Sequence, residues 1–208
     1  MPNSALLAPT PDSVERGYNN RAAVPEHPRF IAQYVELSRA AIGALASRRD
    51  LRYGPGPNET LDLFVPAGAA RGTFVFFHGG YWRAFDKSDF AFVAAPFAGG
   101  VTLSGVHDLE PLVLSTMNAD LRLDRAEARR LSPVHYQAET DAPLVVACGA
   151  DETSEFLRQS ALIYDAWPGS RPRGSSAPLF IPGRHHFNVV LDYADPGSEL
   201  TRATSALF

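Results

Sequence analysis

Cysteine and lysine are the scarce residues of this 208-residue chain. Its single cysteine, Cys148, excludes a disulfide framework and any metal site built from several thiolates. That scarcity favours a reducing, cytoplasmic location. Of the 19 basic residues only Lys87 is a lysine, and the net charge is −4. A surface of this charge predicts no binding to nucleic acid or to an anionic membrane.

Long hydrophobic runs are also absent. The longest uncharged stretch, 90–106, is interrupted by Pro96, Gly99 and Gly100, and it is shorter than an ordinary membrane-spanning helix. The first nine residues lack the basic and apolar regions of a secretory signal. We therefore expect no membrane segment and no export.

The composition instead indicates one globular domain over residues 1–208, with 45% hydrophobic residues. Five prolines within residues 1–28 predict an irregular N-terminal arm. Apolar residues at helical spacing predict a helix over 30–48. Two short alternating runs, 50–53 and 60–65, flank a Gly/Pro-rich turn and predict an antiparallel hairpin.

Beyond the hairpin, short apolar runs alternate with helical patterns, which indicates an α/β fold with a mostly parallel sheet. The predicted buried strands are 73–77, 101–103, 143–148 and 179–181. The predicted helices are 86–97, capped by Asp86 or Ser88, and then 123–131, 152–167 and 188–194. Ligands in such sheets bind beyond the carboxyl ends of the strands, so the residues at those ends are the candidates for chemistry.

The first such end is a glycine loop. His78-Gly79-Gly80-Tyr81-Trp82 follows the predicted strand 73–77 directly. Adjacent glycines let backbone N–H groups point at one position, where they can stabilise an oxyanion. A tight turn beside a buried histidine is the plainer interpretation. The preceding buried strand and the aromatic pair favour the oxyanion loop.

The other two ends supply an acid and a base. Asp151 follows the strand 143–148, where it could orient a histidine or simply cap the next helix. His185 and His186 follow the last strand, where a histidine could act as a general base. The two adjacent histidines could also suggest a metal, but no ligand spacing such as His-Glu-x-x-His occurs. We therefore expect no metal and no cofactor.

A nucleophile is missing from this arrangement. Serine, acid and histidine in that chain order are typical of α/β-hydrolases, whose serine lies in Gly-x-Ser-x-Gly. That motif does not occur in the chain. Ser104 precedes a glycine but has Thr102 two places before it, and Ser176 lies after Asp151. Cys148 lies inside a predicted strand, where a small buried residue is expected.

Several motifs together resemble kynurenine formamidase (arylformamidase) and its bacterial α/β-hydrolase relatives. They are the His78–Trp82 loop, Ser-Gly-Val-His-Asp-Leu at 104–109, Asp-Glu-Thr-Ser-Glu-Phe at 151–156, and His-His-Phe at 185–187. The resemblance spans about residues 14–195. It implies a three-layer α/β-hydrolase fold. It also implies hydrolysis of N-formylkynurenine, a step of tryptophan catabolism, or of small aryl esters.

The resemblance also implies residue roles. Asp151 would be the triad acid, and His186 the base, because the family's histidine directly precedes a phenylalanine. Gly79 and Gly80 would form the oxyanion loop. Aromatic neighbours of a small aromatic formamide or ester substrate would be Tyr81, Trp82, Phe156 and Phe187.

Compared with that family, an internal stretch is missing near residues 97–100. It would contain about two central strands and the serine elbow. Strand 73–77 would then have to pair with the hairpin on one side and with strand 101–103 on the other. The apolar surface of a rearranged sheet could form a homodimer. Three hypotheses follow: a formamidase-like hydrolase that is inactive as this chain stands, a non-catalytic protein that binds an aromatic ligand, and a metal-dependent hydrolase.

Overall fold

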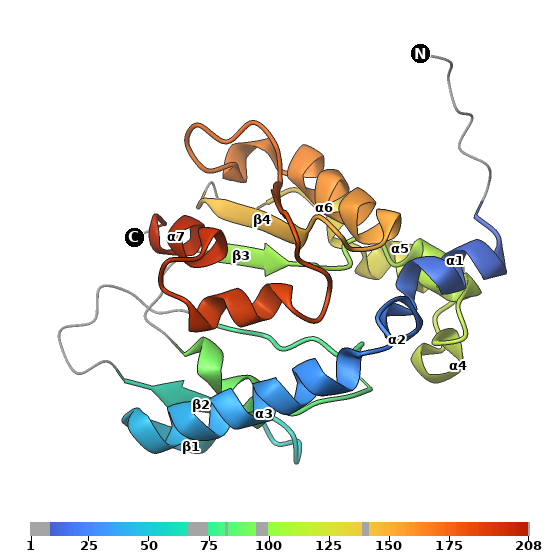
Figure 1. Ribbon diagram of the computed structural model, residues 1–208. Helices are drawn as coiled ribbons and strands as arrows, with labels where there is room; N and C mark the ends of the chain where they lie inside the picture. Colours follow the sequence, from blue (N-terminus) through green and yellow to red (C-terminus); the bar gives the residue numbers. More distant parts are fainter. Residues whose placement is uncertain (1–8, 66–74, 82, 95–99, 139–141, 208) are drawn as a thin grey trace.

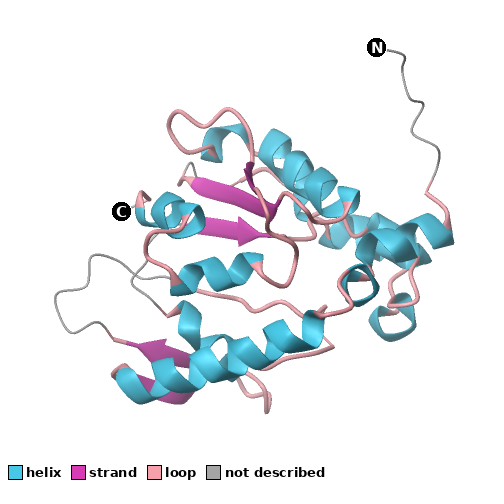
Figure 2. Cartoon of the chain, in the orientation of Figure 1, coloured by secondary structure: helices cyan, strands magenta, loops and turns pink. Residues whose placement is uncertain are grey.

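The computed structural model describes residues 9–65, 75–81, 83–94, 100–138 and 142–207 (Figure 1). They form a mixed α/β structure with two separate sheets (Figure 2). One is an antiparallel hairpin, and the other is a parallel sheet of three strands. The predicted fold class is thereby confirmed at this level. No helix in the described part of the chain is long and apolar enough to cross a membrane.

The N-terminal arm is helical where an irregular segment was expected. Helix α1 spans Pro11–Tyr18 and α2 spans Asn20–Ala23. Thr10 and Ser13 form a reciprocal capping box at the start of α1. Pro11 occupies the first turn, where the missing N–H is tolerated. The prolines of this arm therefore mark helix starts as well as breaks.

The next elements follow the predictions closely. Helix α3 spans His27–Ala44, and the hairpin consists of β1, Ser47–Arg52, and β2, Thr60–Phe64. The strands pair from Ser47 with Phe64 to Arg52 with Thr60. The register shifts between Arg48 and Leu51, where Asp50 has a φ of 56°. A bulge of this kind increases the local twist of the hairpin.

The predicted strand 73–77 is wrong in its described part. Residues 75–79 have no strand pairing, and residues 73 and 74 lie outside the described residues. Val75 is 66% exposed and Phe77 is 87% exposed. Residues 75–79 therefore pair neither with the hairpin nor with β3, which were the expected neighbouring strands. An apolar run can form a buried strand only if partner strands lie beside it.

The helix expected at 86–97 is a shorter 3-10 segment, η1, over Lys87–Val93. Asp86 caps it through the backbone N–H of Ser88, as one of the two predicted caps. A kink at Phe90 interrupts its helical geometry. The end of the predicted helix, 95–97, lies outside the described residues.

The parallel sheet has the order β3-β4-β5. Its strands are Gly100–Leu103, Leu144–Gly149 and Leu179–Ile181, close to three of the four predicted strands. Consecutive residues of β4 are buried, so both faces of this strand are covered, as expected for the centre of a parallel sheet. All three strands run in one direction, so their carboxyl ends meet at the same edge.

Helices cover both faces of this sheet (Figure 1). On one face Val146 packs with Ile163 of α6, and on the other Val145 packs in a cluster with Leu200 of α7. Helices α6 and α7 span Ser154–Ala166 and Glu199–Ser205. The remaining elements are η2 (Glu110–Leu114), α4 (Asn118–Leu121), α5 (Arg125–Leu131), η3 (Pro133–His135), η4 (Pro168–Ser170) and η5 (Val189–Ala194).

Candidate functional site

The segments that follow β4 and β5 bring a carboxylate and an imidazole into contact. The Nδ1 atom of His186 lies 2.8 Å from Oε2 of Glu152. A carboxylate only accepts hydrogen bonds, so Nδ1 carries the proton in this pair. In a neutral imidazole this leaves the lone pair on Nε2, which is the arrangement a general base requires.

Glu152 is a buried carboxylate with several donors. Its side chain is 0% exposed. Oε1 accepts from the Ser104 hydroxyl at 2.5 Å and from the Gly149 N–H at 3.0 Å, while Oε2 faces His186. Burial alone would raise the pKa of Glu152, but the hydrogen bond from His186, its positive charge when the ring is protonated, and the other donors hold it below the ordinary value. The group is therefore ionised at neutral pH.

The sequence assigned the acid to Asp151, the residue before Glu152. In the structure Asp151 is exposed, and its backbone N–H donates to the Arg184 carbonyl at 2.9 Å. The chain then turns, with the Glu152 N–H donating to the Gly149 carbonyl at 3.2 Å. This turn directs the Glu152 side chain inward. The carboxylate that contacts the histidine is thus one residue later than predicted.

Gly149 allows the two strand ends to approach closely. A Cβ atom at this position would lie 2.2 Å from the Arg184 carbonyl oxygen. Beside it, the Ala150 N–H donates to the Ile181 carbonyl at 2.9 Å. The loop that carries His186 is therefore fixed to the loop that carries Glu152 through the backbone.

Aromatic side chains surround the His186 ring. Its centroid lies 4.7 Å from that of Phe156 and 5.6 Å from that of Phe187. Both phenylalanines were predicted substrate neighbours, and both are buried in the protein core. The adjacent His185 packs edge-on against Phe30 at 4.8 Å, and burial lowers its pKa. His186, rather than His185, is thus the histidine paired with a carboxylate.

The predicted oxyanion loop lies in the same region through Tyr81. Burial, followed by the negative charge of Glu152, raises the pKa of the Tyr81 hydroxyl, which donates to the Tyr18 carbonyl at 3.2 Å. Gly80 has a φ of 120°, where a Cβ would lie 2.2 Å from the Ala84 carbonyl oxygen. Gly79 is exposed. Trp82 lies outside the described residues.

The described residues place no nucleophilic side chain in hydrogen-bond contact with the His186 ring. Among the residues that the structure describes, no serine or cysteine side chain forms a hydrogen bond with the His186 ring. Ser104 lies nearby but donates to Glu152. The Cys148 thiol is buried, and burial, followed by the charge of Glu152, raises its pKa. A protonated, buried thiol is a poor nucleophile.

Two other features lie apart from this pair. Asp108, Glu110 and His135 bring three potential metal-ligand atoms within 4.8 Å of one another. The carboxylates are, however, paired with Arg158 and Arg129, at 3.2 Å and 3.0 Å. These ion pairs already compensate the charge that would attract a cation.

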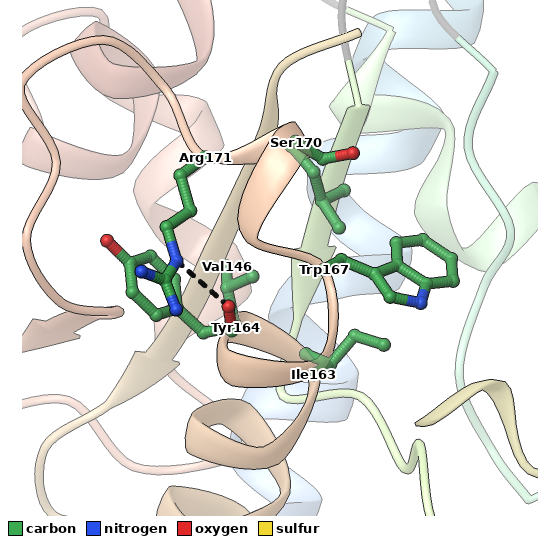
Figure 3. Close-up of a pocket in the computed structure, with 7 residues that line it drawn as sticks. Val146, Ile163, Tyr164, Trp167, Ser170 and Arg171 are labelled. Atoms are coloured by element: carbon green, nitrogen blue, oxygen red, sulfur yellow. Dashed lines mark hydrogen bonds between the residues drawn. The ribbon is translucent and has the colours of Figure 1, made fainter. Parts of the chain in front are cut away.

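A small hollow lies beside β4 and α6 (Figure 3). Arg171 closes part of it, with its guanidinium 4.3 Å from the centre of the Tyr164 ring and its Nε donating to the Tyr164 carbonyl. Leu144 and Val146 line it from the earlier half of β4, away from the strand ends that hold Glu152 and His186. This hollow is thus separate from the acid–base pair.

Two distant relatives by sequence are both kynurenine formamidases. No family model matches the chain. The kynurenine formamidase of Salmo salar is 20% identical over 248 residues, covering 80% of this chain and 84% of its own length. The kynurenine formamidase of Danio rerio is 18% identical over 233 residues, covering 74% and 79%.

The fold is also found in a solved structure. It is the crystal structure of a candidate thioesterase from Silicibacter sp. TM1040, with a TM-score of 0.81 and 24% identity. The match covers 93% of this chain and 98% of that one. At this identity the similarity shows a common fold for the two proteins.

Proposed function

We propose that this chain is a hydrolase of the kynurenine formamidase kind, in which Glu152 and His186 form the acid–base pair. The observation that carries the proposal is the 2.8 Å contact between His186 Nδ1 and Glu152 Oε2 at the ends of adjacent parallel strands. The names of the two distant relatives and the shared fold support the hydrolase class. The substrate would be a small aromatic formamide or ester.

The chemistry of this class is acyl transfer. A serine oxygen attacks the acyl carbon while the histidine Nε2 takes its proton and passes it to the leaving group. Water, activated by the same nitrogen, then releases the acyl group. In this chain His186 would perform the proton transfers while Glu152 orients its ring and stabilises the imidazolium, and Gly79 with Gly80 would supply part of the oxyanion site.

We further propose that the 208-residue form lacks the nucleophile and about two central strands. Three observations support this. Strands β2 and β3 belong to different sheets, and residues 75–79 have no strand partner. The alignment with the salmon protein is 248 positions long but includes only 80% of this 208-residue chain, so it contains positions where this chain has no residue. Loss of a triad serine lowers turnover on the order of 10⁶-fold.

Incubation of the purified chain with N-formylkynurenine and with p-nitrophenyl acetate tests both parts. We expect at most slow ester hydrolysis that a serine-directed fluorophosphonate leaves unchanged. His186→Ala should abolish this residual rate. The matched variant His185→Ala should retain it, because among the described residues His185 has no hydrogen bond to a carboxylate. Turnover blocked by the fluorophosphonate would show that a nucleophilic serine is present.

Ligand binding is measured separately from turnover. In a Trp167→Phe background Trp82 is the remaining tryptophan, so quenching of its fluorescence reports binding near the glycine loop. Quenching by N-formylkynurenine without product would support a non-catalytic ligand-binding protein. If neither quenching nor turnover occurs in a cooperatively folded sample, the formamidase-like assignment is wrong.

A further inference from the structure

Ser104 has an unusual backbone conformation at the end of β3. Its φ is 51°, in the left-handed region that a residue with a Cβ atom seldom occupies. Its backbone N–H donates to the Ala147 carbonyl at 2.9 Å, which extends the pairing of β3 with β4 by one residue. Unfavourable conformations of this kind persist where surrounding contacts hold them, often at functional sites.

The side chain of Ser104 makes a short contact with Glu152. The Oγ atom donates to Oε1 at 2.5 Å. The Gly149 N–H donates to the same oxygen. Two donors on Oε1 fix the rotation of the carboxylate, so that Oε2 is the oxygen left to face His186. The end of β3 thereby contributes to a pair otherwise formed by the ends of β4 and β5.

We propose that Ser104 is a positioning residue, whose hydroxyl holds the Glu152 carboxylate in the orientation that keeps the proton on Nδ1 of His186. This proposal deepens the proposed function, because it concerns the same acid–base pair. Only the importance of this positioning for catalysis rests on the proposed function. Ser104 itself is not the nucleophile: its proton is directed at a carboxylate oxygen, whereas a triad serine donates to the imidazole.

Other titratable groups also face Glu152, and a test must separate them from Ser104. They are His186, His185, the Cys148 thiol and the hydroxyls of Tyr34 and Tyr81. The hydrogen bond from Ser104 is one of the causes that lower the pKa of Glu152. Removal of this hydroxyl leaves the other five groups in place.

Nuclear magnetic resonance of the full chain provides the test. The Nδ1 proton of His186 and the side-chain carboxyl carbon of Glu152 are followed from acid to neutral pH. In Ser104→Ala we expect the Nδ1 proton signal to broaden or disappear. We also expect the Glu152 titration midpoint to move up toward that of an ordinary glutamate. Ser104→Gly should give the same two changes while relieving the backbone conformation, so a folded sample is available in either case.

Ser132→Ala is the matched control. Ser132 is also buried, and its hydroxyl donates to the Ala128 carbonyl and accepts from the Leu109 N–H, away from Glu152. We expect it to lower stability and leave both signals unchanged. Unchanged signals in both Ser104 variants would overturn the proposal, as would a fluorophosphonate adduct found on Ser104 by mass spectrometry. Both signals are present without substrate, so failure here is distinct from failure to bind or hydrolyse a substrate.

Discussion

His107 is an imidazole that burial keeps neutral. Its Nε2 atom lies 3.0 Å from the Thr102 hydroxyl, and its pKa is lowered to about 4 because burial disfavours the charged form. The unfolded chain binds a proton at this residue near pH 6.5, whereas the folded chain does so only near pH 4. Between these values the unfolded state holds more protons, so acidification favours unfolding.

The prediction concerns His107→Gln. In the wild-type chain this histidine should remove up to about 3 kcal/mol of stability as the pH falls from 6.5 to 4, at 1.36 kcal/mol for each unit of pKa difference. The variant should lose correspondingly less over that range. Urea unfolding at pH 7, 5.5 and 4 measures the difference. The exposed residue His78, changed in the same way, is the control. A parallel decline in the His107 variant and in the wild type would contradict the assignment.

The carboxylate that contacts His186 shows how far residue-level prediction reaches. The strand, the turn after it and the presence of an acid there were all predictable from Pro143-Leu-Val-Val-Ala-Cys-Gly and the acids that follow. The choice between Asp151 and Glu152 was not, since it depends on a turn whose hydrogen bonds involve Arg184 and Gly149. His186 was preferred to His185 through the resemblance of His-Phe to a family motif. In the structure His186 contacts a carboxylate, and its role as the base stays a prediction.

The helical arm supports the site at the scale of elements. Tyr18 at the end of α1 donates to Glu155 Oε1 at 2.5 Å and accepts from Gln159 at 2.7 Å, and both partners lie in α6. Thr153, just before α6, donates to the Gly17 carbonyl at 2.6 Å. Because Phe156 of the same helix contacts the His186 ring, the arm indirectly holds the ring's surroundings.

Tyr18→Phe tests this role. The change removes the hydroxyl that donates to Glu155 and accepts from Gln159, so each of these side chains loses one hydrogen bond in a largely buried environment. We expect a loss of about 1–3 kcal/mol in the free energy of unfolding, measured by urea denaturation. Tyr53→Phe, at a residue that is 68% exposed, should change stability by less than about 0.5 kcal/mol. Equal effects of the two changes would show that the arm is not tied to α6.

The arm was mispredicted because proline was interpreted only as a breaker. The order Thr10-Pro11-Asp12-Ser13 is an N-terminal helix signal, with a cap at Thr10 and a proline in the first turn. The helices α3 and α6 were found because their apolar spacing is strong. The strand predicted at 73–77 is absent from its described part for a different reason. Its composition is that of a buried strand, but a strand forms only beside partner strands, which the local sequence does not specify.

At the scale of the molecule, the arrangement of the two sheets leaves apolar side chains exposed. Val75 and Phe77 are mostly exposed, and β3 is an edge strand of its sheet in the described structure. Leu61, Leu63 and Val65 in and after β2 are also exposed by 39–45%. Exposed apolar surface next to an open strand edge favours association between copies.

We therefore predict concentration-dependent self-association that involves Phe77. Phe77→Gln should reduce the association seen by sedimentation or light scattering. It should change the free energy of unfolding by less than about 0.5 kcal/mol, because the ring is 87% exposed. Leu131→Gln, at an exposed residue of α5 outside these segments, is the control and should leave association unchanged. A strictly monomeric wild-type chain would contradict this prediction.

The close contact at Gly149 makes the spacing of acid and base a property of the main chain. A single methyl group there would occupy the place of a carbonyl oxygen in the opposite loop. The loops would have to separate, and His186 would leave Glu152 although neither side chain had changed. The contact between Glu152 and His186 therefore depends on Gly149, a residue that has no side chain of its own.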